Sequence, residues 1–271
     1  ILDRLASVKY FVVKKGKESD LPYGYSRLSG EAEKNGKTYL AYADEDALPL
    51  GYTYDSWISR EDYDKMTVTG KPQALLQGVV LDDSSLPQTE THFNDREVSY
   101  YTSEGKGCRL KNGKVVVTQE NAQLKLVFEG EENAETYLIT EGLDYEGFSP
   151  REMISDKKWF KMTTYEQNKL LEENSNWRYW KESQKASIQI GGRFLKKSIQ
   201  IFTDKYNAYS GKHNFLCNTG YSEKGRHTIT LTFENTGVYS FDSLKIYCQP
   251  MTEIDSQTSK LGEEVLTDVK I

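Results

Sequence analysis

Strict alternation of apolar and polar residues near the C-terminus constrains the fold of this chain more than any other feature. Residues 226–233 read Arg-His-Thr-Ile-Thr-Leu-Thr-Phe, with an apolar residue at every second position from the isoleucine onward. A period of two residues is typical of a half-buried β-strand. Residues 214–221 and 238–250 flank this segment and also contain aromatic and β-branched residues. We therefore predict a run of strands, paired as a closing hairpin, at the end of an antiparallel β-sandwich.

Composition agrees with a mainly β protein of the jelly-roll-like sandwich type. The 271 residues include 19 tyrosines and 6 prolines, and tyrosine favours strands. The net charge of −6 argues against a nucleic-acid partner, because phosphate binding needs clusters of lysine and arginine. Mean hydropathy is −0.70, and no apolar run approaches the roughly 20 residues of a membrane span. We expect a water-soluble domain. Its ends, Ile1 and Ile271, carry no leader-like or stop-like segment, so we also expect a piece excised from a longer protein.

Residues 1–90 are predicted to form a small α+β subdomain. Residues 59–62 resemble a capping box that starts a short helix, and Pro72 is placed at the first position of a second helix over 73–77. A polar, turn-rich stretch at 82–91 predicts the boundary. The strand candidates in this region are residues 6–13, 37–43, 50–54 and 79–81.

Residues 91–256 are predicted to form the sandwich. Asn112-Gly113 lies between two strand candidates, and this dipeptide is a strong hairpin signal because both residues tolerate positive φ. The β pattern breaks at about 149–180, where Thr163 and Glu166 have capping-box spacing, so an aromatic-rich helical insertion is expected. Residues 257–271 are predicted to be a polar tail or linker.

Three cysteines cannot form a complete set of disulfides. Cys248 is in phase with Leu244 and Ile246, so it is predicted to be a small buried residue of the core. A bridge between Cys217 and Cys248 on neighbouring strands stays open as the alternative.

No cofactor or metal is expected from the motifs of the chain. His92, His213 and His227 lack the spacing of a zinc site, and neither a nucleophile elbow nor a phosphate-binding loop is present. Asp82 and Asp83, next to two serines, offer oxygen ligands to Ca²⁺ but lack the spacing of a recognised calcium loop. Adjacent acidic residues are expected by chance on solvated loops in a chain with 41 Asp and Glu residues.

Aromatic residues of the insertion, together with a segment further along the chain, are the one cluster that suggests a ligand. Aromatic rings stack on the apolar faces of sugars, while Asp, Asn and Arg bind hydroxyl groups. The alternative is that these aromatics cover the sheet, or contact the remainder of a longer protein, since aromatic clusters are usually core. The candidate carbohydrate-binding residues are Trp177, Tyr179, Trp180, Asp204, Tyr206, Asn207 and Tyr209.

Five phrases of the sequence, taken in order, resemble one protein family. They lie at residues 5–13, 47–52, 71–77, 214–221 (Asn-Phe-Leu-Cys-Asn-Thr-Gly-Tyr) and 239–247. Their order and spacing resemble the large extracytoplasmic region of YfhO-like bacterial membrane proteins. The resemblance implies a polytopic parent similar to GT-C-type glycosyltransferases, which take a sugar from a polyprenyl-phosphate carrier. It also implies a cell-envelope glycopolymer such as lipoteichoic acid as the acceptor.

The resemblance assigns no catalytic residue to this chain, because the catalytic acids of GT-C enzymes usually lie near the N-terminal membrane spans. It implies an accessory domain outside the cytoplasm whose partners are the membrane-embedded remainder of the same polypeptide and the glycopolymer. Two other functions stay open. One is an interaction module that docks on the membrane core. The other is a free-standing glycoside-active enzyme, which needs two acids about 5–9.5 Å apart across a cleft.

Overall fold

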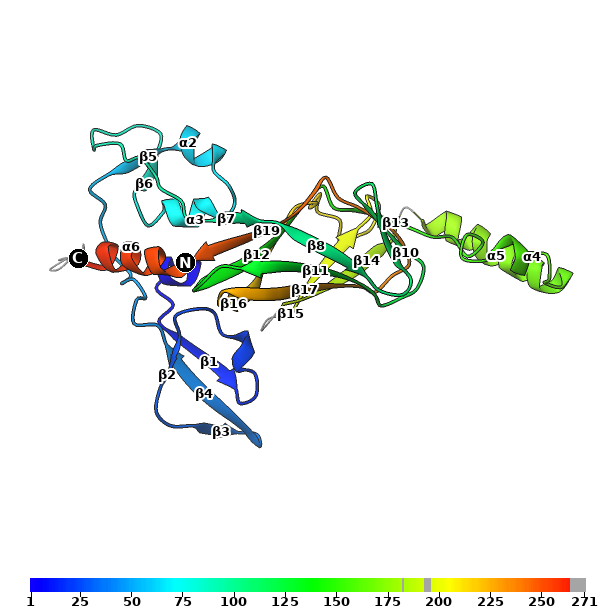
Figure 1. Ribbon diagram of the computed structural model, residues 1–271, viewed down its shortest axis with the longest axis horizontal. Coiled ribbons are helices and arrows are strands. Elements are labelled where there is room, and N and C mark those ends of the chain that lie inside the picture. The colour runs from blue at the N-terminus through cyan, green and yellow to red at the C-terminus, as the bar shows by residue number, and fades with distance from the viewer. Residues whose placement is uncertain (182, 193–195, 264–271) are drawn as a thin grey trace.

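The computed structural model, which describes residues 1–181, 183–192 and 196–263, is a mainly β protein built around an antiparallel sandwich (Figure 1). This confirms the predicted fold class. One layer of the sandwich is a five-stranded sheet with the order β15-β14-β17-β11-β8. Its strands are β8 (Tyr100–Glu104), β11 (Ala122–Gly130), β14 (Lys185–Gly191), β15 (Lys196–Phe202) and β17 (Gly225–Phe233).

The second layer is a four-stranded antiparallel sheet with the order β16-β12-β19-β7. Its strands are β7 (Arg96–Val98), β12 (Ala134–Glu141), β16 (Phe215–Ser222) and β19 (Ser243–Pro250). The main core lies between the two layers. As the alternation predicted, Ile229, Leu231 and Phe233 are all buried in it, each with at most 1% of its surface exposed.

The predicted closing hairpin is wrong in its pairing. β16 pairs with β12, whereas the next strand, β17, pairs with β11 and β14 in the other layer. The connection from β16 to β17 therefore passes from one layer of the sandwich to the other. The alternating pattern determines which side of a strand faces the core, but both layers offer the same apolar interior, so it does not determine the neighbouring strand.

A third sheet, with the order β13-β18-β10-β9, closes one end of the sandwich. Asn112 and Gly113 form the turn between its strands β9 and β10, with φ values of 51° and 71°, which confirms the predicted hairpin. The strands are β9 (Cys108–Lys111), β10 (Lys114–Val117), β13 (Asp144–Gly147) and β18 (Gly237–Ser240).

The N-terminal region forms two lobes on opposite sides of the sandwich end in Figure 1. One lobe is a small antiparallel sheet around β4 (Lys37–Ala43), which pairs with β1 (Tyr10–Lys14), β2 (Ser26–Arg27) and β3 (Ala32–Lys34). Ahead of it lie α1 (Leu2–Leu5) and, within it, the 3-10 turn η1 (Glu18–Asp20).

The other lobe contains the parallel pair β5 (Trp57–Ser59) and β6 (Val79–Leu81), with α2 (Arg60–Lys65) and α3 (Gly70–Ala74). Ser59 caps α2 as predicted, since its side chain accepts a hydrogen bond from the Asp62 amide. Pro72 is the third residue of α3, two positions later than predicted, which the first helical turn tolerates. The strand predicted at residues 50–54 does not form, and Tyr52 makes an isolated bridge there.

Residues 251–263 form helix α6 (Met251–Glu263), which corrects the prediction of a tail or linker from residue 257 over its described part. Met251, Ile254 and Leu261 are buried against Leu48 and Leu76. Although the segment is mostly polar, these three residues form an apolar stripe at helical spacing. The apparent polarity misled the prediction because the stripe faces residues about 200 positions away in the chain. A division of the chain at residue 90 stays a prediction.

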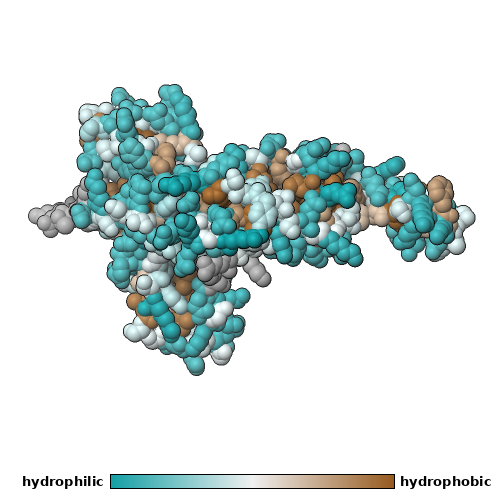
Figure 2. Space-filling model, viewed as in Figure 1, coloured by the Kyte–Doolittle hydropathy of each residue, from teal (hydrophilic) through white to brown (hydrophobic). Residues whose placement is uncertain are grey.

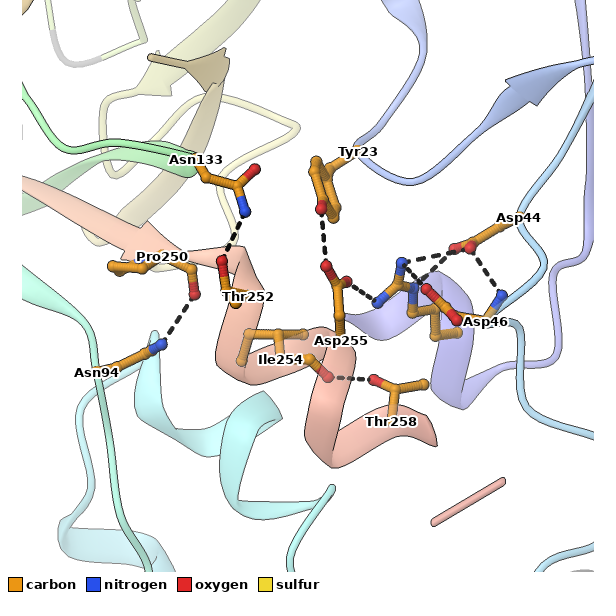
Figure 3. A network of polar contacts seen from close by, with 11 residues as sticks. Tyr23, Asp44, Asp46, Asn94, Asn133, Pro250, Thr252, Ile254, Asp255 and Thr258 are labelled. Atoms are coloured by element: carbon orange, nitrogen blue, oxygen red, sulfur yellow. Dashed lines mark hydrogen bonds and ion pairs between the residues drawn. The ribbon is translucent and has the colours of Figure 1, made fainter. Parts of the chain in front are cut away.

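A buried arginine joins α1, the first lobe and α6 (Figure 3). The guanidinium of Arg4 binds the carboxylates of Asp44 (2.7 Å), Asp46 (3.0 Å) and Asp255 (2.7 Å). The hydroxyl of Tyr23 donates to the other oxygen of Asp255 at 2.8 Å. Elsewhere in the same view, the side chain of Asn133 donates to the Thr252 hydroxyl at the start of α6 (2.8 Å).

The predicted helical insertion is confirmed as an arm that projects from the far end of the sandwich (Figure 1). It contains α4 (Asp156–Trp159) and α5 (Thr164–Trp180), and the Thr163–Glu166 capping box is complete. Phe160 and Tyr165 near the free end have 79% and 78% of their surface exposed. Figure 2 shows apolar surface at this end of the arm.

All three cysteines are free and buried, as predicted for Cys248. The alternative bridge is wrong because β16, which carries Cys217, and β19, which carries Cys248, lie on opposite sides of β12. Two strand spacings separate them by roughly 9.5 Å, beyond the reach of a disulfide.

Candidate functional site

The predicted aromatic residues of the insertion lie in the last turn of α5, where the arm joins the sandwich. Trp177 is half-buried, and Tyr179 has 78% of its surface exposed. Trp180 is the last residue of α5, and its side chain lies outside the described part of the structure. Of the two described side chains, Tyr179 therefore presents the larger exposed fraction to solvent.

The second half of the predicted site is the loop that follows β15. The ring of Tyr206 stacks on Phe202, with ring centroids 5.0 Å apart. The Tyr209 hydroxyl lies 3.2 Å from Nε2 of His213, and partial desolvation together with the Asp204 carboxylate raises its pKa. Asp204 and Asn207 are exposed. Both tyrosines of the loop thus contact other residues of the same segment.

Hydrogen bonds hold these two segments next to each other. The Gln184 amide donates to the Thr203 hydroxyl (2.6 Å), and the Thr203 amide donates back to the Gln184 carbonyl (3.0 Å). The Ser183 hydroxyl also donates to the carbonyl of Lys205 (3.3 Å). The structure therefore brings the end of α5 and the loop to one edge of the sandwich. Carbohydrate binding at the seven residues stays a prediction.

A cavity of about 530 Å³ lies against the outer face of the four-stranded sheet. We call it the sheet pocket. Its floor comes from β12, β16 and β19, and its walls come from α1, the segment after η1, and the residues around the start of α3. Its apolar lining includes Val68, Pro72, Phe215 and Leu216. Its volume is in the range of small-molecule sites, which combine an apolar lining with a few placed polar groups.

Glu135 is the most deeply placed charge of the sheet pocket, with 5% of its surface exposed. Ala134 and Leu138 of β12 are buried in the sandwich core, so strand alternation directs Glu135 and Tyr137 to the opposite, outer face. The Tyr137 hydroxyl donates a short hydrogen bond to the Glu135 carboxylate. Burial, followed by the charges of Glu135 and Asp3, raises the pKa of Tyr137 well above its ordinary value, so the phenol stays a neutral donor.

A bulge in β16 lies beside this pair. Thr136 of β12 faces Gly220, while Tyr137 faces Asn218, so Thr219 is an extra residue in the partner strand. The Thr219 hydroxyl donates to the Thr136 carbonyl at 3.0 Å, which fixes the irregularity. Bulges bend a strand and redirect its side chains, and they are frequent next to functional sites. Here the bulge adjoins Asn218, which also lines the sheet pocket.

The amide of Gln249 connects the floor of the pocket to its wall. Gln249 pairs with Glu135 across β12 and β19 and has 1% of its surface exposed. Its Nε2 donates to the carbonyl of Thr69 (3.4 Å), and the Thr69 hydroxyl donates to Asp95 (2.6 Å). This chain of contacts holds the second lobe against the sheet.

Lysines line another part of the sheet pocket, near Cys217. Burial raises the pKa of the Cys217 thiol, and the charges of Lys197 and Lys212 act in the opposite direction. The ammonium of Lys212 lies 4.9 Å from the centroid of the Phe215 ring. The pocket therefore offers carboxylates, amides, ammonium groups and an aromatic ring to a single ligand.

Sequence reasoning missed the sheet pocket. Glu135 and Tyr137 alternate with core residues of β12, which places them on its outer face but indicates no ligand. Nothing in the local pattern indicates that α1 and the segment around α3 cover them, because these walls lie more than 60 residues away in the chain.

Among the residues that the structure describes, no group of three or more His, Cys, Asp or Glu side chains is arranged to hold a metal ion. Over the same residues, no helix is both long enough and apolar enough to cross a membrane.

Three comparisons relate this chain to known proteins. The family model described as "Bacterial membrane protein YfhO" matches residues 1–271. The "Uncharacterized protein YfhO" of Bacillus subtilis (strain 168) is 27% identical over 113 residues, which are 42% of this chain and 12% of that protein. The match therefore spans a small part of the curated relative. A solved structure of TmCBM61 in complex with β-1,4-galactotriose has a TM-score of 0.25 and 14% identity, and the match covers 56% of this chain and 88% of that one.

Proposed function

Since the chain belongs to the YfhO family of bacterial membrane proteins, we propose that it is a non-catalytic, extracytoplasmic domain that holds a glycopolymer for its parent protein. The parent would be a glycosyltransferase that uses a lipid-linked sugar, and the glycopolymer would be a cell-envelope acceptor of the lipoteichoic-acid type. In this proposal the catalytic groups lie elsewhere in the parent.

The observation that carries the proposal is the lining of the sheet pocket. Phe215 and Leu216 provide apolar surface for the C–H face of a sugar ring, beside Asn218 on the same strand. Asn218 and Glu135 can bind neighbouring hydroxyl groups as donor and acceptor. This division into an apolar wall and a few convergent polar groups suits a glycan better than a purely apolar ligand.

The seven residues predicted from sequence are proposed as a second, separate contact for a long polymer. Tyr179, Asp204, Asn207 and Tyr209 are the exposed members among the described side chains. A polymer can engage two weak sites at once, and the second contact then forms at a raised effective concentration.

Calorimetric titration of the 271-residue chain with fragments of a teichoic-acid-type glycopolymer tests the proposal. We expect saturable binding that weakens about tenfold, or about 1.4 kcal/mol, in both Phe215→Ala and Asn218→Ala. Leu50→Ala is the matched control, since Leu50 is 96% exposed and lies outside the pocket. No binding, or equal binding by all variants, would refute the pocket assignment.

The same samples decide between binding and hydrolysis. Asp3, Asp20 and Glu135 all line the sheet pocket, and glycosidases act with a pair of carboxylates. Our proposal expects the glycopolymer to be recovered intact after prolonged incubation. Release of new reducing ends that is lost in Glu135→Gln would favour the glycoside-active alternative.

One observation favours a second candidate function, an interaction module. Phe160 and Tyr165, beside the ends of the two arm helices, expose most of their aromatic surface, and exposed apolar patches often mark interaction sites. The partner proposed here is the membrane-embedded remainder of the same polypeptide. A photo-crosslinking residue at Phe160 in the full-length parent should then give an intramolecular product, whereas one at Leu50 should not.

A further inference from the structure

Among the residues that the structure describes, no lysine, arginine or histidine forms an ion pair with Glu135. Glu135 is a buried residue, with 5% of its surface exposed. Among the described residues, the side-chain hydrogen bond recorded for the Glu135 carboxylate comes from the Tyr137 hydroxyl, which is a neutral donor. Removing a carboxylate from water costs several kcal/mol unless a cation or several donors replace the water. The structure therefore places a carboxylate with little compensation in the sheet pocket.

The positive charges of the sheet pocket belong to Lys197 and Lys212, which lie near Cys217. Lys197 and Lys212 affect the thiol of Cys217, whereas the charges that affect the Tyr137 hydroxyl are those of Glu135 and Asp3. None of the ion pairs of the described residues joins Lys197 or Lys212 to Glu135. Cys217 pairs with Leu138, three residues along β12 from Glu135, so the pocket has an acidic side around Glu135 and a basic side around Cys217.

We infer that the acidic side of the sheet pocket binds an ammonium group carried by the glycan, with Glu135 as the counter-ion and Asp3 as a second negative charge. This inference rests on the proposed function, and it specifies the class of ligand as an amine-bearing glycan. The ring of Tyr137 lies on the same side of the strand, next to the carboxylate, where an aromatic face adds to the attraction for a cation.

A pair of ligands with the same skeleton tests the inference. A tetramer of glucosamine carries an ammonium group on each ring at pH 6, whereas its fully N-acetylated form carries none. The 271-residue chain should bind the glucosamine tetramer about tenfold or more tightly than the acetylated tetramer, because a hydrogen bond to a charged group contributes more than one between neutral groups.

Glu135→Gln removes the charge and keeps the shape of the side chain. We expect it to lose the preference for the amine, so that it binds the two tetramers with equal affinity. Glu146→Gln is the matched control, since Glu146 is exposed on β13, outside the pocket. If Glu135→Gln does not fold, Asp3→Asn provides a second measurement, and it should reduce the preference by a smaller factor.

The outcomes separate the inference from the proposed function. Equal affinity for the two tetramers, with loss of binding in Phe215→Ala, would overturn the inference and leave the glycan proposal standing. A preference for the amine that survives in both Glu135→Gln and Asp3→Asn would also overturn it, because the charge would then be recognised elsewhere. No binding of either tetramer or of the glycopolymer would refute both.

Discussion

The guanidinium of Arg4 lies 2.7 Å from the carboxylate of Asp44, and both side chains are almost completely buried, with 3% and 2% of their surface exposed. Arg4 comes from α1, Asp44 follows β4, and the same guanidinium reaches Asp255 of α6 (Figure 3). One side chain thus connects three parts of the chain, and one of these parts, α1, also lines the sheet pocket. Because a buried ion pair costs much to break, this junction should be sensitive to substitution.

Arg4→Met is expected to lower the free energy of unfolding by about 3–5 kcal/mol, since it leaves Asp44 buried and unpaired. Arg27→Met is the matched control. Arg27 pairs with Glu31 at 2.8 Å on the exposed surface, so its loss should cost at most about 1 kcal/mol. Urea unfolding measures the loss in free energy of unfolding for each variant. Equal losses would show that the buried Arg4 ion pairs stabilise the fold no more than an exposed pair does.

Asp46 should oppose folding at neutral pH. Burial raises its pKa above the usual 3.8, against the effect of Arg4, and the charges of Asp44 and Asp255 add to the increase. The folded state therefore holds this proton more tightly than the unfolded state, and the stability that it contributes is lost as the pH rises above 3.8. Asp46→Asn should therefore reduce the loss of stability between pH 4 and pH 7. At neutral pH its free energy of unfolding should be no more than about 1 kcal/mol below that of the unmodified chain. Thermal unfolding between pH 4 and pH 7, with Asp44→Asn as a strongly destabilised comparison, measures this; an unchanged pH profile would contradict it.

Tyr137→Phe is expected to destabilise the chain by about 1–3 kcal/mol, because the buried Glu135 carboxylate loses its donor. Tyr247 offers a matched control in the same sheet. Its hydroxyl donates to exposed Glu97 at 3.1 Å, so Tyr247→Phe should cost less than about 1 kcal/mol. Adding Glu135→Gln to Tyr137→Phe should recover part of the loss, and a double-mutant cycle in urea gives the coupling energy. A coupling near zero would count against the pairing.

Thr163→Ala should lower the local stability of helix α5 by about 1 kcal/mol and leave the stability of the sandwich unchanged. The Thr163 side chain accepts from the Glu166 amide, and Glu166 binds back to the Thr163 amide at 2.7 Å. Hydrogen exchange should therefore accelerate in α5 and stay unchanged in β11 and β17. Thr164→Ala, one residue further and outside the capping box, is the control. Faster exchange throughout the sandwich would contradict the local effect.

Local signals in the sequence predicted the parts of the fold that depend on neighbouring residues. Asn112-Gly113 predicted its hairpin because both residues adopt positive φ at little cost. Thr163 and Glu166 predicted the start of α5 because their hydrogen bonds span three residues. The alternation at 226–233 predicted the buried face of β17 for the same reason, since it depends on strand geometry alone.

Contacts between distant segments account for what the sequence did not predict. The pairing of β16 with β12 instead of β17, and the burial of Leu261 against Leu48, both depend on which surfaces meet after the chain has collapsed. The candidate site follows the same division. Aromatic residues such as Tyr179 could be named in advance, but the sheet pocket requires α1 and the α3 segment to cover β12.

The sequence by itself determined the class of the domain, the inward face of its strands and the helical arm, because these follow from backbone geometry over a few residues. Tertiary structure alone decided that Arg4 would meet Asp44 and that Glu135 would be buried without an ion pair to any described residue. Burial and charge pairing depend on residues up to about 250 positions apart, and no local pattern encodes that proximity.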